Sequence, residues 1–388
     1  MRIAFYAPLK PSDHPIPSGD RTVARLLVQA LRGGGGEVET ASRIRSRIQA
    51  AEVPRSGEGS DGESGEAAQC KMAAKGAAAA RRLIAKYRAR PKRERPQAWF
   101  TYHLYYKAMD WIGPQVAEAL DIPYLLAEAS HAPKRAGGRY AFSHAATEAA
   151  IRKAAAIFCL NPADKECLSH LLAKRKLIDL APFLDLRRFA GELPDRKVAR
   201  ARLARLHGID ADQPWLLAVG MMREGDKLQS YRMLAEALHR LDRPWQLLVV
   251  GDGAARREVE RAFKPVAGGV FMLGALDHAA LPEVYVAADL FVWPAINEAF
   301  GMALLEAQAC GLPAVAGAWG GVPAIIAEGK TGWLSKPGDS AAFSADVDFA
   351  LDAALPLAGR AARQKALAQH DIAAASHTLI ATIERVLK

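Results

Sequence analysis

The chain of 388 residues lacks the long apolar runs of a membrane protein. No stretch reaches the roughly 18 apolar residues that suggest a spanning helix. The apolar stretch at the N-terminus is stopped by Pro8, too early for a secretory signal. Cysteine is also scarce, and the few thiols show neither metal-ligand spacing nor the density of a disulfide framework. We therefore expect a cytoplasmic protein with free thiols. The four cysteines are Cys70, Cys159, Cys167 and Cys310.

The sequence predicts no metal site and no cofactor. The ten histidines are interpreted as having no ligand role. The turn Gly251-Asp252-Gly253 has no Asp-x-Asp motif near it, so its carboxylate is not expected to bind a metal.

Acidic residues are outnumbered by basic ones, 42 to 52, and the surplus is concentrated near the N-terminal end. Eight basic residues lie between Arg81 and Arg95, against one acid, Glu94. Tyr87 is the lone aromatic there, so the stacking pattern that single-stranded nucleic acid prefers is missing, and nucleic acid is not expected as a partner. Two interpretations stay open: a solvated helix face, or a contact with an anionic membrane surface.

The length favours two domains. In the first half, apolar strands are expected at 3–7, 38–40, 98–102, 124–127 and 157–160, with a helix at 22–31. Residues from about 54 to 76 are polar and rich in glycine, without periodicity, and are expected to be a mobile insertion.

The second half alternates short apolar runs with helical segments. The runs lie at 215–219, 246–250, 270–273, 290–293 and 313–316. This alternation predicts a parallel sheet covered on both faces in each half of the chain. The linker between the halves is expected between about 183 and 212.

One segment carries recognisable chemistry. The strand at 290–293 is followed by a turn through Asn297 and Glu298 and by a helix that is expected to begin near Phe300. The first N–H groups of a helix have no intrahelical acceptor and carry positive dipole, so they suit a pyrophosphate. Gly301 would let that anion approach the backbone closely.

Two carboxylates frame this helix start. At about 1.5 Å per residue, Glu306 lies roughly 8 Å beyond the helix start, while Glu298 stays in the loop. Carboxylates accept paired hydrogen bonds from vicinal hydroxyls such as those of ribose and hexose. The alternative is two solvated glutamates, but Ala-Phe-Gly between them and Cys-Gly-Leu-Pro after them favour a binding site.

The segment from Glu298 to Ala316 resembles the E-x7-E signature of retaining GT-B glycosyltransferases of family 4. Gly320-Gly321-Val322-Pro323, residues 329–332 and residues 337–339 follow in that family's order and spacing. Residues 249–253, 273–274, 281–285 and 287–289 match it upstream. The resemblance implies an α/β protein with the GT-B fold, in which two Rossmann-like domains face each other across a cleft. We expect an acceptor domain at 1–185, a nucleotide-sugar domain at 186–360, and a helix at 361–388 that crosses back to the first domain.

The resemblance also implies roles for residues of the second domain. Main chain at Gly274 and Ala275 would hold the base, Glu306 the ribose and Glu298 the donor sugar. Lys227 matches the lysine that neutralises the leaving diphosphate. The family's arginine is absent, because Met221 follows Gly220; Arg223 is the candidate substitute, and the alternative is an exposed loop charge. Backbone N–H groups for the phosphates would come from the stretch of Ala299, Phe300, Gly301 and Met302.

In the first domain the resemblance is weaker. Ser18-Gly19 resembles the family's glycine loop, so Gly19 is assigned to the donor, and Thr101-Tyr102-His103 resembles its histidine strand. His131 lies about two residues from the expected place of the family's active-site histidine and is a candidate for acid–base chemistry. A structural histidine is the alternative, and Glu128 and Lys134 are competitors for the role.

The implied reaction is transfer of a sugar from a nucleotide-diphosphate sugar to a hydroxyl acceptor, with retention and without a metal. Envelope polysaccharide or glycolipid synthesis, with a lipid-linked acceptor and a place at the inner membrane face, is the expected setting. A GT-B epimerase or phosphorylase is one alternative. Another is a non-catalytic protein that binds a sugar nucleotide or an anionic surface. The paired Glu298 and Glu306 argue against that last reading, while the missing arginine favours it.

Overall fold

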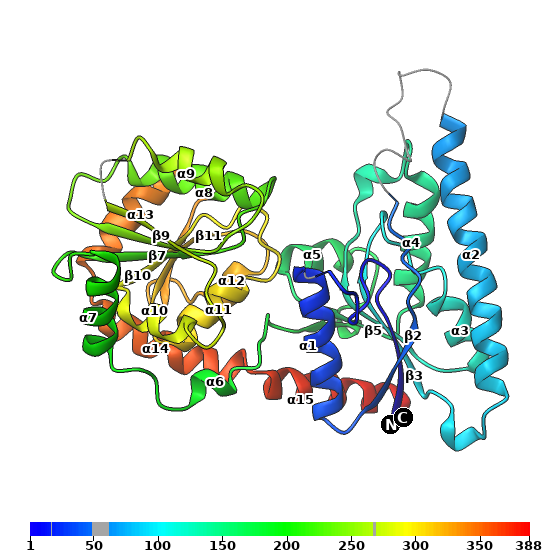
Figure 1. Ribbon diagram of the computed structural model, residues 1–388. Coiled ribbons are helices and arrows are strands. Elements are labelled where there is room, and N and C mark those ends of the chain that lie inside the picture. Colours follow the sequence, from blue (N-terminus) through cyan, green and yellow to red (C-terminus); the bar gives the residue numbers. More distant parts are fainter. Residues whose placement is uncertain (17, 49–61, 267–268) are drawn as a thin grey trace. The chain divides into compact units, whose positions relative to one another are not determined.

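The computed structural model describes residues 1–16, 18–48, 62–266 and 269–388. The chain forms two compact units, shown in Figure 1. Unit 1 contains Met1–Leu180 and Ile372–Lys388, and unit 2 contains Ala181–Asp371. Each unit is built on a six-stranded sheet in which every recorded strand pair is parallel. The α/β class and the parallel sheets are as the alternation of strands and helices predicts.

The sheet of unit 1 has the order β2-β1-β3-β4-β5-β6. One face carries a row of stacked rings: Phe5 lies 5.8 Å from Phe100, and Phe100 lies 5.7 Å from Phe158, between ring centroids. Neighbouring side chains such as Trp99 point to the opposite face because successive residues of a strand alternate. The strands are β1 (Arg2–Tyr6), β2 (Glu37–Ser42), β3 (Ala98–Leu104), β4 (Tyr124–Ala129), β5 (Ala156–Cys159) and β6 (Leu177–Asp179).

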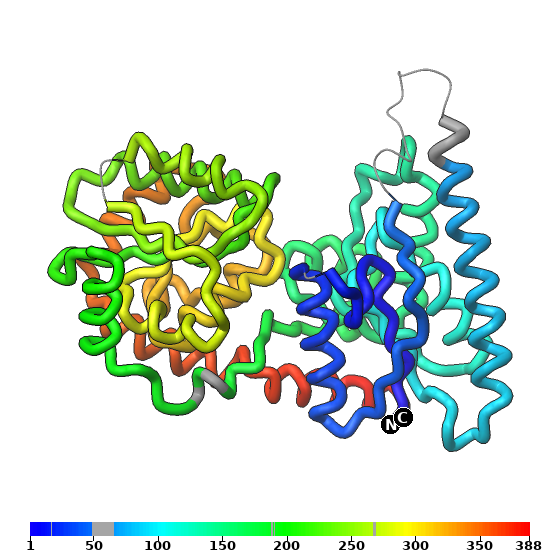
Figure 2. The backbone as a smooth tube through the Cα atoms, viewed as in Figure 1, coloured from blue at the N-terminus to red at the C-terminus, as the bar shows by residue number. Residues whose placement is uncertain are grey.

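Helices cover both faces of this sheet. One group consists of α1 and α15, which pack against each other, as the path of the chain in Figure 2 shows. A Cβ atom built on Gly34, just after α1, would lie 2.3 Å from Ile380 Cγ1 of α15. The second group is α2, α3 and α4. The helices of unit 1 are α1 (Gly19–Gly33), α2 (Gly62–Arg88), α3 (Gly113–Leu120), α4 (Ala141–Lys153), α5 (Pro162–Ser169) and α15 (Ile372–Leu387), with the 3₁₀ turns η2 (Lys92–Glu94), η3 (Pro133–Arg135) and η4 (Lys174–Lys176).

Helix α2 corrects one expectation. The mobile insertion was expected over about 54–76; residues 54–61 lie outside the described part of the chain, but residues 62–76 are helical. Two causes are visible. Alanine, the best helix former, recurs through this stretch. Gln69 is 1% exposed, and its amide donates to the carbonyl of Arg139 (2.8 Å) and accepts from the N–H of Ser143 (3.0 Å).

The sheet of unit 2 has the order β12-β11-β10-β7-β8-β9. Its strands are β7 (Trp215–Val219), β8 (Gln246–Val250), β9 (Gly269–Gly274), β10 (Leu290–Trp293), β11 (Ala314–Gly317) and β12 (Gly332–Ser335). The helices are α6 (Arg187–Ala190), α7 (Arg196–His207), α8 (Asp226–Leu238), α9 (Arg256–Phe263), α10 (Leu281–Ala287), α11 (Met302–Ala309), α12 (Val322–Ile325), α13 (Ser340–Asp352) and α14 (Leu355–Gln369). The expected strands are confirmed within one or two residues, while β6 and β12 are additions.

The division into units differs from the expected 1–185, 186–360 and 361–388. Helix α14 belongs to unit 2, where Arg363 Nη1 donates to the carbonyl of Ala309 at 2.5 Å. The helical run breaks at His370, which is fully buried, and whose Nδ1 lies 2.7 Å from the carbonyl oxygen of Pro182. The N–H of Leu184 donates to the carbonyl of His370 at 2.9 Å. Only α15 therefore returns to unit 1.

No helix in the described ranges combines the length and the apolar character that crossing a bilayer requires.

Gly76 tests the packing of α2. A Cβ atom at this position would lie 2.2 Å from Trp111 Cβ and 3.3 Å from the Trp111 carbonyl carbon. Gly76→Ala should therefore destabilise the protein by about 1–3 kcal/mol through overpacking. This is opposite to the gain of about 1 kcal/mol that the same change gives in an exposed helix. Urea unfolding measures it. Gly137→Ala, where a Cβ meets nothing within 4 Å, is the control. A stabilised Gly76→Ala protein would contradict this packing.

Candidate functional site

The strand order of unit 2 defines one position at the carboxyl edge of the sheet. From β7 the chain proceeds to β8 and β9 on one side, and then returns to place β10 on the other. In open α/β sheets, ligands bind at the carboxyl ends of the strands where the order reverses in this way. The loops that follow β7 and β10 meet at this switch point, and both were assigned to the donor from the sequence.

The switch point of unit 2 brings Lys227 and Glu298 together. Lys227 lies in the first turn of α8, and its Nζ contacts Glu298 Oε2. The two side chains are 20% and 18% exposed. The other oxygen, Oε1, accepts from the N–H of Gly301 at 3.3 Å. Glu298 thus joins the lysine to the beginning of α11, the two features expected to bind a diphosphate.

The loop between β10 and α11 is held in an unusual conformation. Ala295 and Asn297 have φ values of 55° and 50°, which L-residues rarely adopt. The N–H of Ile296 donates to Ser230 Oγ, and Asn297 Nδ2 donates to Asp226 Oδ1, both at 3.0 Å. Left-handed non-glycine residues cost about 1–3 kcal/mol each and cluster at functional sites, where the surroundings hold them. The contacts from α8 supply that support here.

Two glycines allow main chain to approach this edge. A Cβ atom at Gly251, where φ is +143°, would lie 1.9 Å from the carbonyl oxygen of Gly220. At Gly320, where φ is +51°, it would lie 2.2 Å from the carbonyl oxygen of Glu298. Only glycine fits either position, so the loops after β7, β8 and β11 close around the same edge of the sheet.

Helix α11 begins slightly later than expected. Gly301 precedes its first residue with φ +74°, and the helix runs from Met302. The Phe300 side chain is 6% exposed and lies 6.1 Å from the ring of Phe183, so it belongs to the core. Ala299 is exposed. The N–H groups at the helix start are thus the groups of this stretch that are available to a ligand.

Glu306 is enclosed. It is 8% exposed, and its Oε2 accepts from the Tyr285 hydroxyl at 3.0 Å. Tyr285 is a residue that the sequence reasoning missed, although it stands in a matched stretch. At the end of β9, Gly274 has φ +73° with open space at its Cβ position, and Ala275 is exposed.

Arg223 is not brought to Glu298 in this structure. Its side chain is exposed in the loop after β7, and no ion pair or hydrogen bond from its guanidinium is recorded within the described ranges. Its carbonyl accepts from the N–H of Leu228 at 3.1 Å. The substitution of Arg223 for the family's arginine therefore stays a prediction.

Unit 1 has a switch point of its own, between β1 and β3. Gly19 and Asp20 open α1 after β1, and His103 and Glu128 lie near the ends of β3 and β4. His103 Nδ1 lies 3.2 Å from Asp20 Oδ1 and 3.9 Å from Glu128 Oε1. His103 and Glu128 have φ values of 62° and 56°. Four of the five non-glycine residues with positive φ in the described part of the chain thus lie at the two switch points.

The charges around His103 shift its titration. Burial lowers the pKa of His103, but the carboxylates of Glu128 and Asp20 outweigh burial, so the pKa lies above its ordinary 6.5. Burial raises the pKa of Glu128, and the nearby His103 only partly offsets it. Burial acts to raise the pKa of Asp20. The hydrogen bond to His103 and the positive charge of His103 outweigh burial, so the pKa of Asp20 lies below its ordinary value. The histidine therefore carries a proton more readily than a free imidazole.

His131, the histidine assigned from the sequence, lies in another group. Its neighbours are His144 and Glu148 of α4, and its Nε2 is 3.4 Å from Glu148 Oε2. The histidine that lies among carboxylates at the strand ends is His103. The resemblance of Thr101-Tyr102-His103 to the histidine strand was the signal that identified this position.

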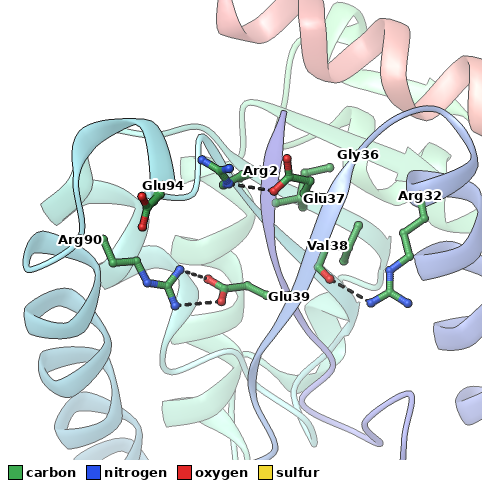
Figure 3. A pocket seen from close by; sticks show the side chains of 9 residues that line it. Arg2, Arg32, Gly36, Glu37, Val38, Glu39, Arg90 and Glu94 are labelled. Carbon is green, nitrogen blue, oxygen red and sulfur yellow. Dashed lines mark hydrogen bonds and ion pairs between the residues drawn. The ribbon is translucent and has the colours of Figure 1, made fainter.

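Part of the basic block between Arg81 and Arg95 makes hydrogen bonds and ion pairs within unit 1. Arg90 Nη1 and Nη2 each lie 3.0 Å from an oxygen of Glu39, and Arg88 Nη2 donates to the carbonyl of Ala119 at 2.8 Å. Figure 3 shows Arg90 and Glu39 at a cavity of about 570 Å³ beside the first residues of β1 and β2. Arg2 pairs there with Glu37 at 2.9 Å. Because its charges are paired internally and it lies away from the carboxyl ends of the strands, this cavity is a weak candidate for the site.

Residues 213–353, from just before β7 to the end of α13, match the family model described as Glycosyl transferases group 1. This segment is a glycosyl transferases group 1 domain. The group 1 domain includes Lys227, Glu298 and Glu306.

Curated relatives match mainly this part of the chain. A D-inositol 3-phosphate glycosyltransferase of Xylanimonas cellulosilytica is 32% identical over 188 residues, 47% of this chain and 43% of that protein. The sulfoquinovosyl transferase SQD2 of Arabidopsis thaliana is 33% identical over 138 residues, 35% of this chain and 26% of that protein. The chain thus spans less than half the length of these relatives.

Solved structures match nearly the whole chain. A sucrose-phosphate synthase from Thermosynechococcus elongatus has a TM-score of 0.70 at 21% identity, over 99% of this chain and 98% of that one. Anabaena Alr3699/HepE, in complex with UDP, has a TM-score of 0.67 at 14% identity, over 99% of this chain and all of that one. The group 1 domain is thus part of a GT-B fold.

The His103 group outside the group 1 domain predicts a pH dependence. A histidine whose folded-state pKa is raised contributes stability that is present below its unfolded value of 6.5 and is lost as pH rises through the folded value. The free energy of unfolding of the wild type minus that of His103→Gln should therefore fall as pH rises above 6.5.

Urea unfolding between about pH 6 and about pH 9 measures this difference. His170→Gln, at an exposed histidine of the same unit, is the control for the loss of an imidazole as such. A difference for His103→Gln that is flat or grows with pH would show that the carboxylates do not retain the proton.

Proposed function

We propose that the chain is a glycosyltransferase that moves a sugar from a nucleotide-diphosphate sugar to a hydroxyl acceptor with retention of configuration. The observation that carries the proposal is the meeting of Lys227, Glu298 and the beginning of α11 at the switch point of a group 1 domain. The matched relatives bear glycosyltransferase names, and the Anabaena structures are complexes with UDP and with UDP-glucose. These support a nucleotide-sugar donor.

The donor would be held by groups with separate tasks. The N–H groups at the start of α11 and the Lys227 ammonium would bind the diphosphate, and they would stabilise the negative charge that grows as it leaves. Lys227 is paired with Glu298 in this structure, so a bound diphosphate would take over part of that pairing. Glu298 would then be able to accept hydrogen bonds from the donor sugar. Glu306, held by Tyr285, would accept from the ribose, and main chain at Gly274 and Ala275 would meet the base.

Retention is part of the same proposal. The bond between the sugar's anomeric carbon and the phosphate oxygen would break, and the bond to the acceptor oxygen would form on the same face. The acceptor's proton would pass to the departing phosphate oxygen, so no protein base need be strong. The acceptor side would be unit 1, where His103 with its carboxylates lies at the strand ends. Envelope polysaccharide or glycolipid synthesis is the proposed setting.

Two other functions fit some features of the site. An epimerase or phosphorylase of the same fold would use the same donor groups. A non-catalytic sugar-nucleotide binder would fit the absence of an arginine beside Gly220. Release of nucleoside diphosphate that depends on an added acceptor would be expected only of a transferase. A screen of UDP-, GDP- and ADP-sugars, by thermal stabilisation and by hydrolysis, identifies the donor for that assay.

Substitutions in the group 1 domain should separate chemistry from binding. Lys227→Ala should lower turnover about 10²-fold or more, because a group that stabilises the leaving charge is lost. Glu306→Ala should weaken donor binding by about 1–3 kcal/mol through lost ribose hydrogen bonds. Steady-state kinetics and calorimetry measure the two effects.

Arg223→Ala and Lys330→Ala complete this series. Lys330→Ala, at an exposed lysine of unit 2, should behave as wild type. If Arg223→Ala leaves turnover unchanged while Lys227→Ala lowers it strongly, Arg223 is not part of the site. If Lys227→Ala and Arg223→Ala are both harmless, the leaving-group role proposed here is wrong.

The exposed part of the basic block favours an acceptor presented at a membrane. Arg88 donates to the carbonyl of Ala119, and Arg90 pairs with Glu39. Arg81, Arg82 and Lys86 of α2 are exposed. Each lysine or arginine near an anionic leaflet contributes about 1 kcal/mol, so these three suffice for a measurable contact. A lipid-linked acceptor would be concentrated by that contact.

Co-sedimentation with vesicles checks the contact. Replacing Arg81, Arg82 and Lys86 by glutamine should weaken binding to anionic vesicles about 10-fold or more, and salt should weaken wild-type binding. The control replaces Lys174, Arg175 and Lys330, which are also exposed, with the same change of charge. If the wild type binds neutral and anionic vesicles equally, or if the control loses as much binding as the variant, the proposed membrane contact is wrong.

A further inference from the structure

Three side chains of metal-binding type meet in unit 1, apart from the His103 group. His131 lies between β4 and η3, and His144 and Glu148 lie on α4. One ligand atom from each can be chosen so that all three lie within 4.8 Å of one another. His144 and Glu148 are four residues apart and therefore share one face of the helix. The sequence reasoning, which assigned no ligand role to any histidine, passed over this spacing.

Both imidazoles present a buried nitrogen without a hydrogen-bond partner. His144 is 4% exposed, and its ring bonds to the carbonyl of Ala132. Its Nε2 has no partner, so the bond to Ala132 is made by Nδ1, and the Nε2 lone pair is free. The His131 side chain is 8% exposed, and its Nε2 also has no hydrogen bond. The two ring centroids are 5.0 Å apart. Leaving two buried polar atoms without a hydrogen bond is unfavourable, and one shared ion would bind both.

The carboxylate is oriented for the same purpose. Glu148 Oε1 accepts from Arg152 Nε at 3.0 Å and Nη2 at 2.7 Å, one helical turn further on. Glu148 Oε2 is left facing His131 Nε2 at 3.4 Å. A partner that fixes the orientation of a ligand is the usual outer shell of a metal site. The Glu148 side chain is 32% exposed, which gives an ion a way in from solvent.

We propose that His131, His144 and Glu148 bind one divalent transition-metal ion, with zinc as the best fit. Two imidazole nitrogens and one carboxylate oxygen are a zinc set that keeps a fourth position for water or another oxygen ligand. Magnesium and calcium prefer oxygen ligands and suit this set poorly. The ion would join the segment after β4 to helix α4. Glu128 lies in β4 itself, just before that segment. This inference does not depend on the proposed transferase activity.

Zinc titration of the untagged full-length chain, by calorimetry, tests the site. Cys70 is exposed and is replaced by serine throughout, so that its thiol does not bind zinc. One equivalent should bind, and His144→Ala or Glu148→Gln should weaken binding more than about 100-fold, since outer-shell partners alone are worth about 10–100-fold. His170→Ala, at an exposed histidine, should bind as the unsubstituted chain does.

A second measurement, the melting temperature, distinguishes loss of the metal site from misfolding of the variant. Glu148→Gln keeps the shape of the side chain, so its melting temperature without metal should equal that of the parent. Zinc should raise the melting temperature of the parent and of His170→Ala, but not that of Glu148→Gln. Absence of one-equivalent binding by the parent would overturn the proposal. So would equal affinity in the parent and in Glu148→Gln.

Discussion

The arrangement of both units depends on one constraint: parallel strands end at a common edge, and adjacent loops diverge only where the strand order reverses. The chain makes this reversal at β1/β3 and again at β7/β10. At each place a charged pair forms between a helix start and a strand end, Asp20 with His103 and Lys227 with Glu298. The left-handed residues at β7/β10 are held by contacts from α8, so the charged groups there are positioned before any ligand arrives.

The central strands of the fold could be read from the sequence because burial on both faces produces unbroken apolar runs. Strands 215–219, 246–250 and 290–293 were located without error for this reason. β6 and β12 were not, since they are short and stand at the outer ends of their sheets. The start of α2 was missed because its composition resembles a flexible segment, and it is the tertiary contact of Gln69 that fixes it.

For the site, the motifs and the resemblance nominated residues, but they did not give the contacts between residues far apart in the chain. Glu298, Gly301 and Glu306 follow from one stretch of sequence. The hydroxyl of Tyr285 on Glu306 joins residues 21 apart, and the contact of Lys227 with Glu298 joins residues 71 apart. The environments of His103 and His131 likewise depend on which strands and helices are neighbours. Sequence reasoning could therefore nominate both histidines, but only the fold separates their surroundings.

The place of α15 has a consequence for biosynthesis. Unit 2 is one continuous segment, whereas unit 1 is completed by the last 17 residues, Ile372–Lys388. While the chain is being made, the segment at Gly34 has no partner until α15 has been translated, which happens after all of unit 2. Domains usually fold from the N-terminus as they emerge. Here unit 1, which is translated first, can complete its fold only after unit 2 has been translated, and the surface of α1 that contacts α15 stays uncovered in the meantime.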